Sequence, residues 1–79
     1  MIEYISVVVY NSDYEKMADF ESVEESIEYV ERLNKTGCVL DTGLFWSDKG
    51  AMHNWSISSE NIKRMGDMNM ELWISNYPK

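Results

Sequence analysis

Residues 22–33 of the chain read Ser-Val-Glu-Glu-Ser-Ile-Glu-Tyr-Val-Glu-Arg-Leu, and this stretch decides the fold because it specifies where the main helix begins and which face is apolar. Ser22 and Glu25 form a capping box, in which the serine hydroxyl accepts a hydrogen bond from the third helical amide and the glutamate reaches back to the cap amide. At 100° per residue, four apolar side chains fall within an arc of about 120°. They are Val23, Ile27, Val30 and Leu33. The pattern predicts an amphipathic helix that packs this arc against a sheet and ends before Gly37.

Strand patterns flank the predicted helix on both sides. Residues 2–10 are rich in β-branched and aromatic side chains on both faces, which is typical of a strand in the middle of a sheet. Residues 14–20 alternate as the return arm of a hairpin would. Beyond the helix, residues 38–46 and 51–57 predict a second hairpin around a turn at 47–50. Residues 58–66 then predict a short capped helical turn, and residues 68–75 a final strand.

Hairpin, capped helix, hairpin, short helical turn and last strand is the element order of the β-grasp fold. The chain resembles the ubiquitin family in length, in a helix whose cap lies near position 22, and in the stretch Ser58-Ser59-Glu60-Asn61-Ile62 ahead of the last strand. It ends Asn76-Tyr77-Pro78-Lys79 with no diglycine, so the resemblance implies a scaffold and not a conjugated modifier. We predict an α+β fold: a small mixed β-sheet of ββαββ order plus a short helical turn and a last strand, β-grasp-like, with one amphipathic helix packed on one face.

Length and composition point to one folded domain. The 79 residues are 44% hydrophobic and 13% aromatic, which is too apolar for disorder and suits a single compact domain over residues 1–79. No segment approaches the ~18 consecutive apolar residues of a membrane span, and the start lacks a basic, cleavable leader. Cys38 is the only cysteine, so no internal disulfide forms. We therefore expect a cytoplasmic protein, in the host cytoplasm if a phage encodes it.

Negative charge is concentrated in one window. Residues 13–31 hold eight acids and one base, a formal charge of −7 that equals the net charge of the whole chain. Within it, Glu24, Glu28 and Glu31 form a row on the helix face opposite the apolar arc. Such a chain repels phosphate backbones and anionic lipids, so we expect no direct nucleic-acid binding, no membrane binding, and a protein partner with a basic surface. The other interpretation is that the acidic face only provides solubility.

Residue types that catalyse reactions or bind metals in other proteins lack suitable neighbours in this sequence. Cys38 and His53 resemble a nucleophile and a base, but the predicted hairpin separates them by roughly 20 Å, which favours a structural thiol and a surface imidazole. No ligand pair among residues 38–53 has metal-site spacing. The triplet Asp41-Thr42-Gly43 occurs in aspartic proteases, which need a second carboxylate from another lobe or subunit. We expect no enzyme, no metal and no cofactor, and a hydrolase is the least favoured alternative.

Three tryptophans are difficult to bury together in so short a chain. Trp73 is out of phase with the apolar positions of the last strand, so we predict that it emerges on the sheet face that the helix leaves uncovered, with Tyr4 and Tyr10. An exposed aromatic patch there would mark an interface. For Trp46 and Trp55, partial burial beneath loops is an equally good interpretation.

Two functional hypotheses follow. The first is a small acidic, non-enzymatic protein-binding module that acts as an inhibitor or nucleic-acid mimic and blocks a basic surface of a host nucleic-acid-processing or defence protein. In size, charge and lack of enzyme motifs the chain is similar to the inhibitors that bacteriophages make. Its candidate partner-binding residues are Glu15, Asp19, Glu21, Glu24, Glu28, Glu31 and Trp73. The second is a structural or assembly subunit that forms a homodimer through the aromatic sheet face and an edge strand.

Overall fold

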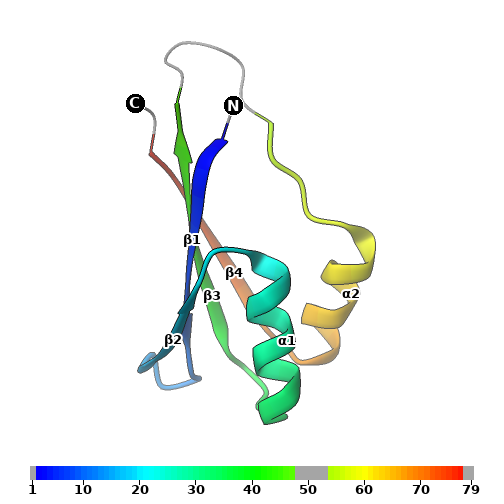
Figure 1. Ribbon diagram of the computed structural model, residues 1–79. Coiled ribbons are helices and arrows are strands. Elements are labelled where there is room, and N and C mark those ends of the chain that lie inside the picture. Colours follow the sequence, from blue (N-terminus) through cyan, green and yellow to red (C-terminus); the bar gives the residue numbers. More distant parts are fainter. Residues whose placement is uncertain (1, 48–53, 78–79) are drawn as a thin grey trace.

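The computed structural model describes residues 2–47 and 54–77 as one mixed sheet with two helices on the same face (Figure 1). The elements are β1 (Ile2–Tyr10), β2 (Lys16–Phe20), α1 (Val23–Leu33), β3 (Val39–Trp46), α2 (Ser59–Asp67) and β4 (Glu71–Tyr77). The strand order is β2-β1-β3-β4. β1 is antiparallel to both of its neighbours, whereas β4 is parallel to β3. The predicted α+β class and mixed sheet are confirmed.

The second half of the chain differs from the predicted element order. Residues 54–57 pair with no strand, and residues 51–53 lie outside the described residues, so the described part of the chain does not form the predicted return strand. Trp55 and Ile57 instead pack against the core while Asn54 and Ser56 are exposed. The alternating pattern therefore serves an extended segment laid over the core, and α2 connects β3 directly to the parallel strand β4.

Both helices begin as predicted and end differently. The Ser22 hydroxyl accepts from the Glu25 amide at 3.1 Å, and the Ser58 hydroxyl accepts from the Asn61 amide at 3.1 Å. The left-handed residue after α1 is Asn34, with φ 52°, although Gly37 is also left-handed. Gly66 does not end α2, which continues to Asp67 and is longer than the predicted turn.

The core lies between the sheet and α1. Val7 and Val9 of β1 and Ile27 of α1 have no exposed surface, and Leu40 and Met65 complete the cluster from β3 and α2. Register places alternate residues of each strand on this helix-covered face and leaves the others on an open face.

Leu33 corrects the predicted helix arc. It is 43% exposed, because it lies at the margin of the arc and is the last residue of α1. Ser26 completes the buried face in its place, and its hydroxyl donates to the carbonyl of Ser22 at 2.9 Å. A buried polar group is tolerated there because its hydrogen bond is made within the helix.

Replacing Ile27 by Ala should lower the free energy of unfolding by about 2 to 5 kcal/mol, because it removes a fully buried aliphatic side chain and leaves a cavity. Leu33→Ala on the same helix is the matched control and should cost much less, because Leu33 is already in contact with water. Urea denaturation of both variants measures the difference. Equal losses would contradict the packing of α1.

Thr42 supplies an independent test of the sheet. Its hydroxyl oxygen is buried and has no hydrogen-bond partner in the described residues, an arrangement that costs free energy. Thr42→Val should therefore raise the free energy of unfolding by about 1 kcal/mol. A thermal melt checks the sign, and a lower melting temperature would mean that the hydroxyl is satisfied in solution.

Candidate functional site

The acidic row of α1 lies beside α2, and Arg64 of α2 is hydrogen-bonded to Glu31. Arg64 Nη2 donates to Glu31 Oε1 at 2.6 Å and Nε donates to Oε2 at 3.1 Å, a two-point pairing that matches the planar guanidinium to the carboxylate. Glu24 Oε1 lies 3.9 Å from Nη1 of the same group. Arg64 Nη1 also donates to Asn61 Oδ1 at 3.1 Å, which anchors the guanidinium on its own helix. Part of the predicted partner-binding row therefore bridges the two helices.

Glu31 and Arg64 alter each other's titration. The hydrogen bonds from Arg64 and its positive charge hold the pKa of Glu31 below its ordinary value, against a smaller opposing effect of burial. The same hydrogen bond to Glu31 raises the pKa of Arg64 above its ordinary value. The pair is charged at neutral pH, and Glu28 beside it is exposed and forms no ion pair within the described residues.

Three further carboxylates follow the margin of the sheet along β2. Glu15 Oε1 accepts from Asn11 Nδ2 at 3.2 Å in the loop before β2. Asp19 Oδ2 lies 2.9 Å from Lys16 Nζ, and both side chains are exposed. Glu21 follows the last residue of β2, is exposed, and makes no hydrogen bond or ion pair to another residue of the described ranges.

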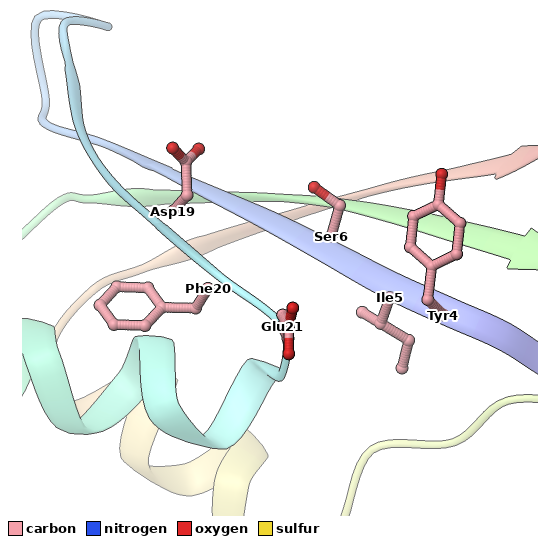
Figure 2. A pocket seen from close by; sticks show the side chains of 6 residues that line it. All are labelled: Tyr4, Ile5, Ser6, Asp19, Phe20 and Glu21. Atoms are coloured by element: carbon pink, nitrogen blue, oxygen red, sulfur yellow. The ribbon is translucent and has the colours of Figure 1, made fainter.

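A hollow of about 350 Å³ lies where β2 stops beside β1 (Figure 2). We call it the β1 notch, and its lining residues are Tyr4, Ile5, Ser6, Asp19, Phe20 and Glu21. It forms because β2 ends at Phe20, opposite Val7, so the earlier residues of β1 have β3 on one side and no strand of the described chain on the other. Two of the predicted partner-binding acids thus border a cavity, a placement that sequence reasoning did not foresee.

The open face of the sheet carries a ladder of three aromatic rings. Tyr4 stacks on Phe45 with ring centroids 4.2 Å apart, and Phe45 stacks on Tyr77 at 4.6 Å, across three neighbouring strands. Gly43 allows the rings to lie close, because a Cβ there would be 3.1 Å from the Phe45 ring and 3.2 Å from the Tyr77 ring. Tyr4 is 54% exposed, so the ladder presents aromatic surface to solvent.

Trp73 lies on this open face and is 43% exposed, as predicted, and the register places Tyr4 and Tyr10 on the same face. Tyr14, from the loop before β2, stacks on Trp73 at 5.8 Å, and neither Tyr4 nor Tyr10 does. Tyr14 adopts a left-handed φ of 63°, which is uncommon for an aromatic residue. The loop is supported by the Asn11 side-chain oxygen, which accepts from two backbone amides at 2.9 and 3.0 Å.

The other two tryptophans are covered. Trp46 is buried, and its indole N–H donates to Asn76 Oδ1 at 3.1 Å. Trp55 is half-buried against the core. Burial is therefore confirmed for both, but Trp46 is more deeply buried than predicted, and Trp55 packs against the core from the extended segment 54–57.

Cys38 is buried, and burial raises the pKa of its thiol. His53 and Asp48 lie outside the described residues. Within residues 2–47 and 54–77, no group of three or more His, Cys, Asp or Glu side chains is placed to hold a metal ion. In the same ranges no helix is long and apolar enough to cross a membrane.

Comparisons with protein-family models, curated protein sequences and solved structures gave no match.

Sequence reasoning missed Arg64 and most of the aromatic ladder. No local signal identifies Arg64, which is 33 positions from Glu31 and meets it only through helix packing. The ladder depends on the register of β4 against β3, which places Tyr77 beside Phe45. Tyr77 does share the phase of Trp73 in the last strand, and that alternation was the available clue.

The Glu31–Arg64 pair predicts a specific pH dependence. Because the pKa of Glu31 is lowered by folding, its stabilisation is complete above the ordinary value of 4.5 and is lost as pH falls through the folded value. Arg64→Met should therefore destabilise the protein near neutral pH, and the difference from wild type should shrink as the pH is lowered below 4.5. Urea denaturation across this range measures it.

Lys63→Met is the control for this experiment, since Lys63 forms an exposed pair with Asp67 within α2 at 2.9 Å and such pairs contribute little. If the difference in the free energy of unfolding between wild type and Arg64→Met stays constant with pH, the Glu31–Arg64 pairing is absent in solution.

Proposed function

We propose that this chain is an acidic, non-enzymatic protein-binding module for a partner with a basic surface. In its sharper form it is an inhibitor or nucleic-acid mimic that occupies the surface a nucleic-acid-processing or defence protein uses for phosphates. The observation that carries the proposal is the placement of acids from one sequence window on two adjoining elements, β2 and α1, with exposed carboxylates that have few internal partners.

The distribution of charge supports this proposal over solubility alone. Of the window's acids, Glu31 is held by Arg64, and Asp19 has the exposed partner Lys16. Glu21 and Glu28 have no ion-pair partner in the described residues and remain available to a cation on another molecule. Clustered charge of one sign accelerates association with an oppositely charged surface and orients it.

Self-association is a second candidate, and one observation favours it. Ile62, which is 55% exposed, lines a mainly apolar hollow of about 280 Å³ together with Leu72 of β4, and Ile74 of the same strand is 46% exposed. β4 is also an edge strand of the sheet. Exposed edges with apolar side chains are common sites of pairing between chains.

Reversing two acids on α1 should abolish capture of a basic partner. In Glu24→Lys with Glu28→Lys, neither Glu31, Arg64 nor the apolar arc is substituted, and the only ion pair lost among the described residues is the 3.9 Å contact of Glu24 with Arg64, so the fold should persist. The matched control is Glu60→Lys with Glu71→Lys, which makes the same change of net charge at exposed positions on α2 and β4. Each protein serves as bait in a lysate of the native host, and the bound proteins are identified by mass.

The proposal predicts a captured protein with a basic surface whose retention falls steeply with salt, for wild type and control alike. Circular dichroism verifies that both variants are folded. Equal capture by the two variants at low ionic strength would contradict a role for the acidic face. Concentration-dependent dimers that resist salt, with no captured protein, would favour self-association.

A further inference from the structure

The first half of β1 has a pairing edge that no strand of the described chain occupies. β2 pairs with β1 only from Val7 to Tyr10, whereas β3 pairs along the strand from Tyr10 to Ile2. On the β2 side, residues 2–6 therefore have no strand partner among the described residues. Alternate backbone N–H and C=O groups of such an edge point sideways, where another strand can pair with them.

The side chains around this edge fall into two sets by face. Figure 2 shows Tyr4, Ser6 and Asp19 projecting to one side of the sheet, which is the open face, while Ile5 and Phe20 project to the other. The first set offers a carboxylate, a hydroxyl and an exposed ring, and the second is apolar and packs against the core. Glu21 stands at the end of β2, where the chain turns into α1 (Figure 2).

We propose that the β1 notch binds an extended segment of a partner protein, which adds as a strand beside residues 2–6. The basic side chains of this segment lie on the open face of the sheet, and its apolar side chains lie on the helix-covered face. The inference rests on the proposed function, since it takes the partner to be basic, and it names how part of that partner is held. In strand addition the backbone hydrogen bonds hold the segment and the alternate side chains select it.

The charges near the notch complement such a segment. Glu21 has no cationic partner in the described chain, and the Lys16–Asp19 pair is exposed on both sides, so an incoming cation replaces it at little cost. The exposed ring of Tyr4 is a further place for a guanidinium to stack. On the other face, Ile5 and Phe20 give apolar side chains of the segment a surface to cover.

A second copy of this chain matches the notch poorly. Among the four described strands, the sole basic residue is Lys16 of β2, so no strand here offers alternating basic and apolar side chains. Two copies also carry a formal charge of −7 each, which opposes their approach. The observations therefore favour a basic segment of another protein.

The test uses the full chain labelled with nitrogen-15 and the synthetic peptide acetyl-Arg-Val-Arg-Val-Arg-amide as the probe. Titration at about 0.15 M ionic strength should give saturable shifts of the backbone amides of residues 3–6, with smaller shifts at Phe20 and Glu21. The same peptide with glutamate in place of arginine should give no saturable shift. A version N-methylated on two successive central amides, which blocks both of its edges, should bind on the order of tenfold more weakly.

Matched variants locate the charge recognition. Glu21→Lys should weaken binding of the arginine peptide on the order of tenfold. Glu60→Lys makes the same change of net charge at a residue that does not line the notch, and it should weaken binding less than about twofold. Neither position is in the core, so both variants should keep the wild-type amide spectrum outside their own neighbourhood.

Four results would overturn the inference. Saturable shifts confined to α1, or equal weakening by Glu21→Lys and Glu60→Lys, would exclude the notch as the binding site. Either result would leave capture through the acidic face intact. Undiminished binding of the N-methylated peptide would exclude strand addition. Shifts of residues 3–6 that grow with protein concentration in the absence of peptide would make a second copy the occupant. Failure of the capture experiment with Glu24→Lys and Glu28→Lys is a separate result and bears on the proposed function alone.

Discussion

The architecture depends on a first strand that is apolar on both of its faces. Val7 and Val9 are fully buried against the helices, while Val8 between them is half-buried on the open face. A strand with apolar side chains on both faces is favoured in the middle of a sheet, where side chains of the neighbouring strands shield part of each face, and β1 has β2 on one edge and β3 on the other. α1 then packs Ile27 and Val30 onto the same buried valines. α2 lies in the helix layer with α1, and β4 adds an edge strand to the sheet, so both extend the structure without changing this core.

The concentration of acids has two structural consequences. A window with this much charge of one sign repels itself, and folding brings its members closer together. Arg64 relieves part of that repulsion, since its guanidinium bonds Glu31 and lies near Glu24 while resting on α2. The ion pair thereby connects the two helices at their solvent side. Glu21 and Glu28, which form no ion pair within the described residues, stay exposed and give the molecule its electrostatic character.

Predictions from sequence were correct where local chemistry decides the structure. The Ser22 half of the predicted capping box and the cap at Ser58 place both helix starts, because each is a contact between residues three positions apart. Predictions were wrong where a pattern has two solutions. The alternation around Trp55 and Ile57 suits a paired strand and also suits an extended segment laid on the core, and only the tertiary arrangement separates them.

The features of the candidate site fall into the same two groups, those decided by local sequence and those decided by tertiary contacts. That Trp73 emerges on the open face follows from its phase within β4, which is a local property. Its stacking on Tyr14 does not, because that ring comes from a distant loop with an uncommon backbone conformation. Arg64 belongs to this second class, and so does the cavity beside β1. Long-range contacts of this kind leave no periodic signal in the sequence. The sequence therefore predicts which residues form the acidic surface better than it predicts the shape of that surface.

The notch is nevertheless a consequence of a local signal. For β2 to pair with Tyr4–Ser6 in its present register, the chain would have to stay extended through Glu21, Ser22 and Val23. Ser22 would then leave its position as helix cap, which is worth about 1 kcal/mol, and the first turn of α1 would lose its satisfied amides. The cap therefore stops β2 at Phe20, the fifth residue of that strand, beside a first strand of nine residues. The mismatch in strand length leaves an edge that no described strand occupies, and Asp19 and Glu21 stand beside it because the acidic window spans the turn from β2 into α1. One capping interaction thus connects the helix start, the short edge strand and the acidic cavity where we infer that a basic segment binds.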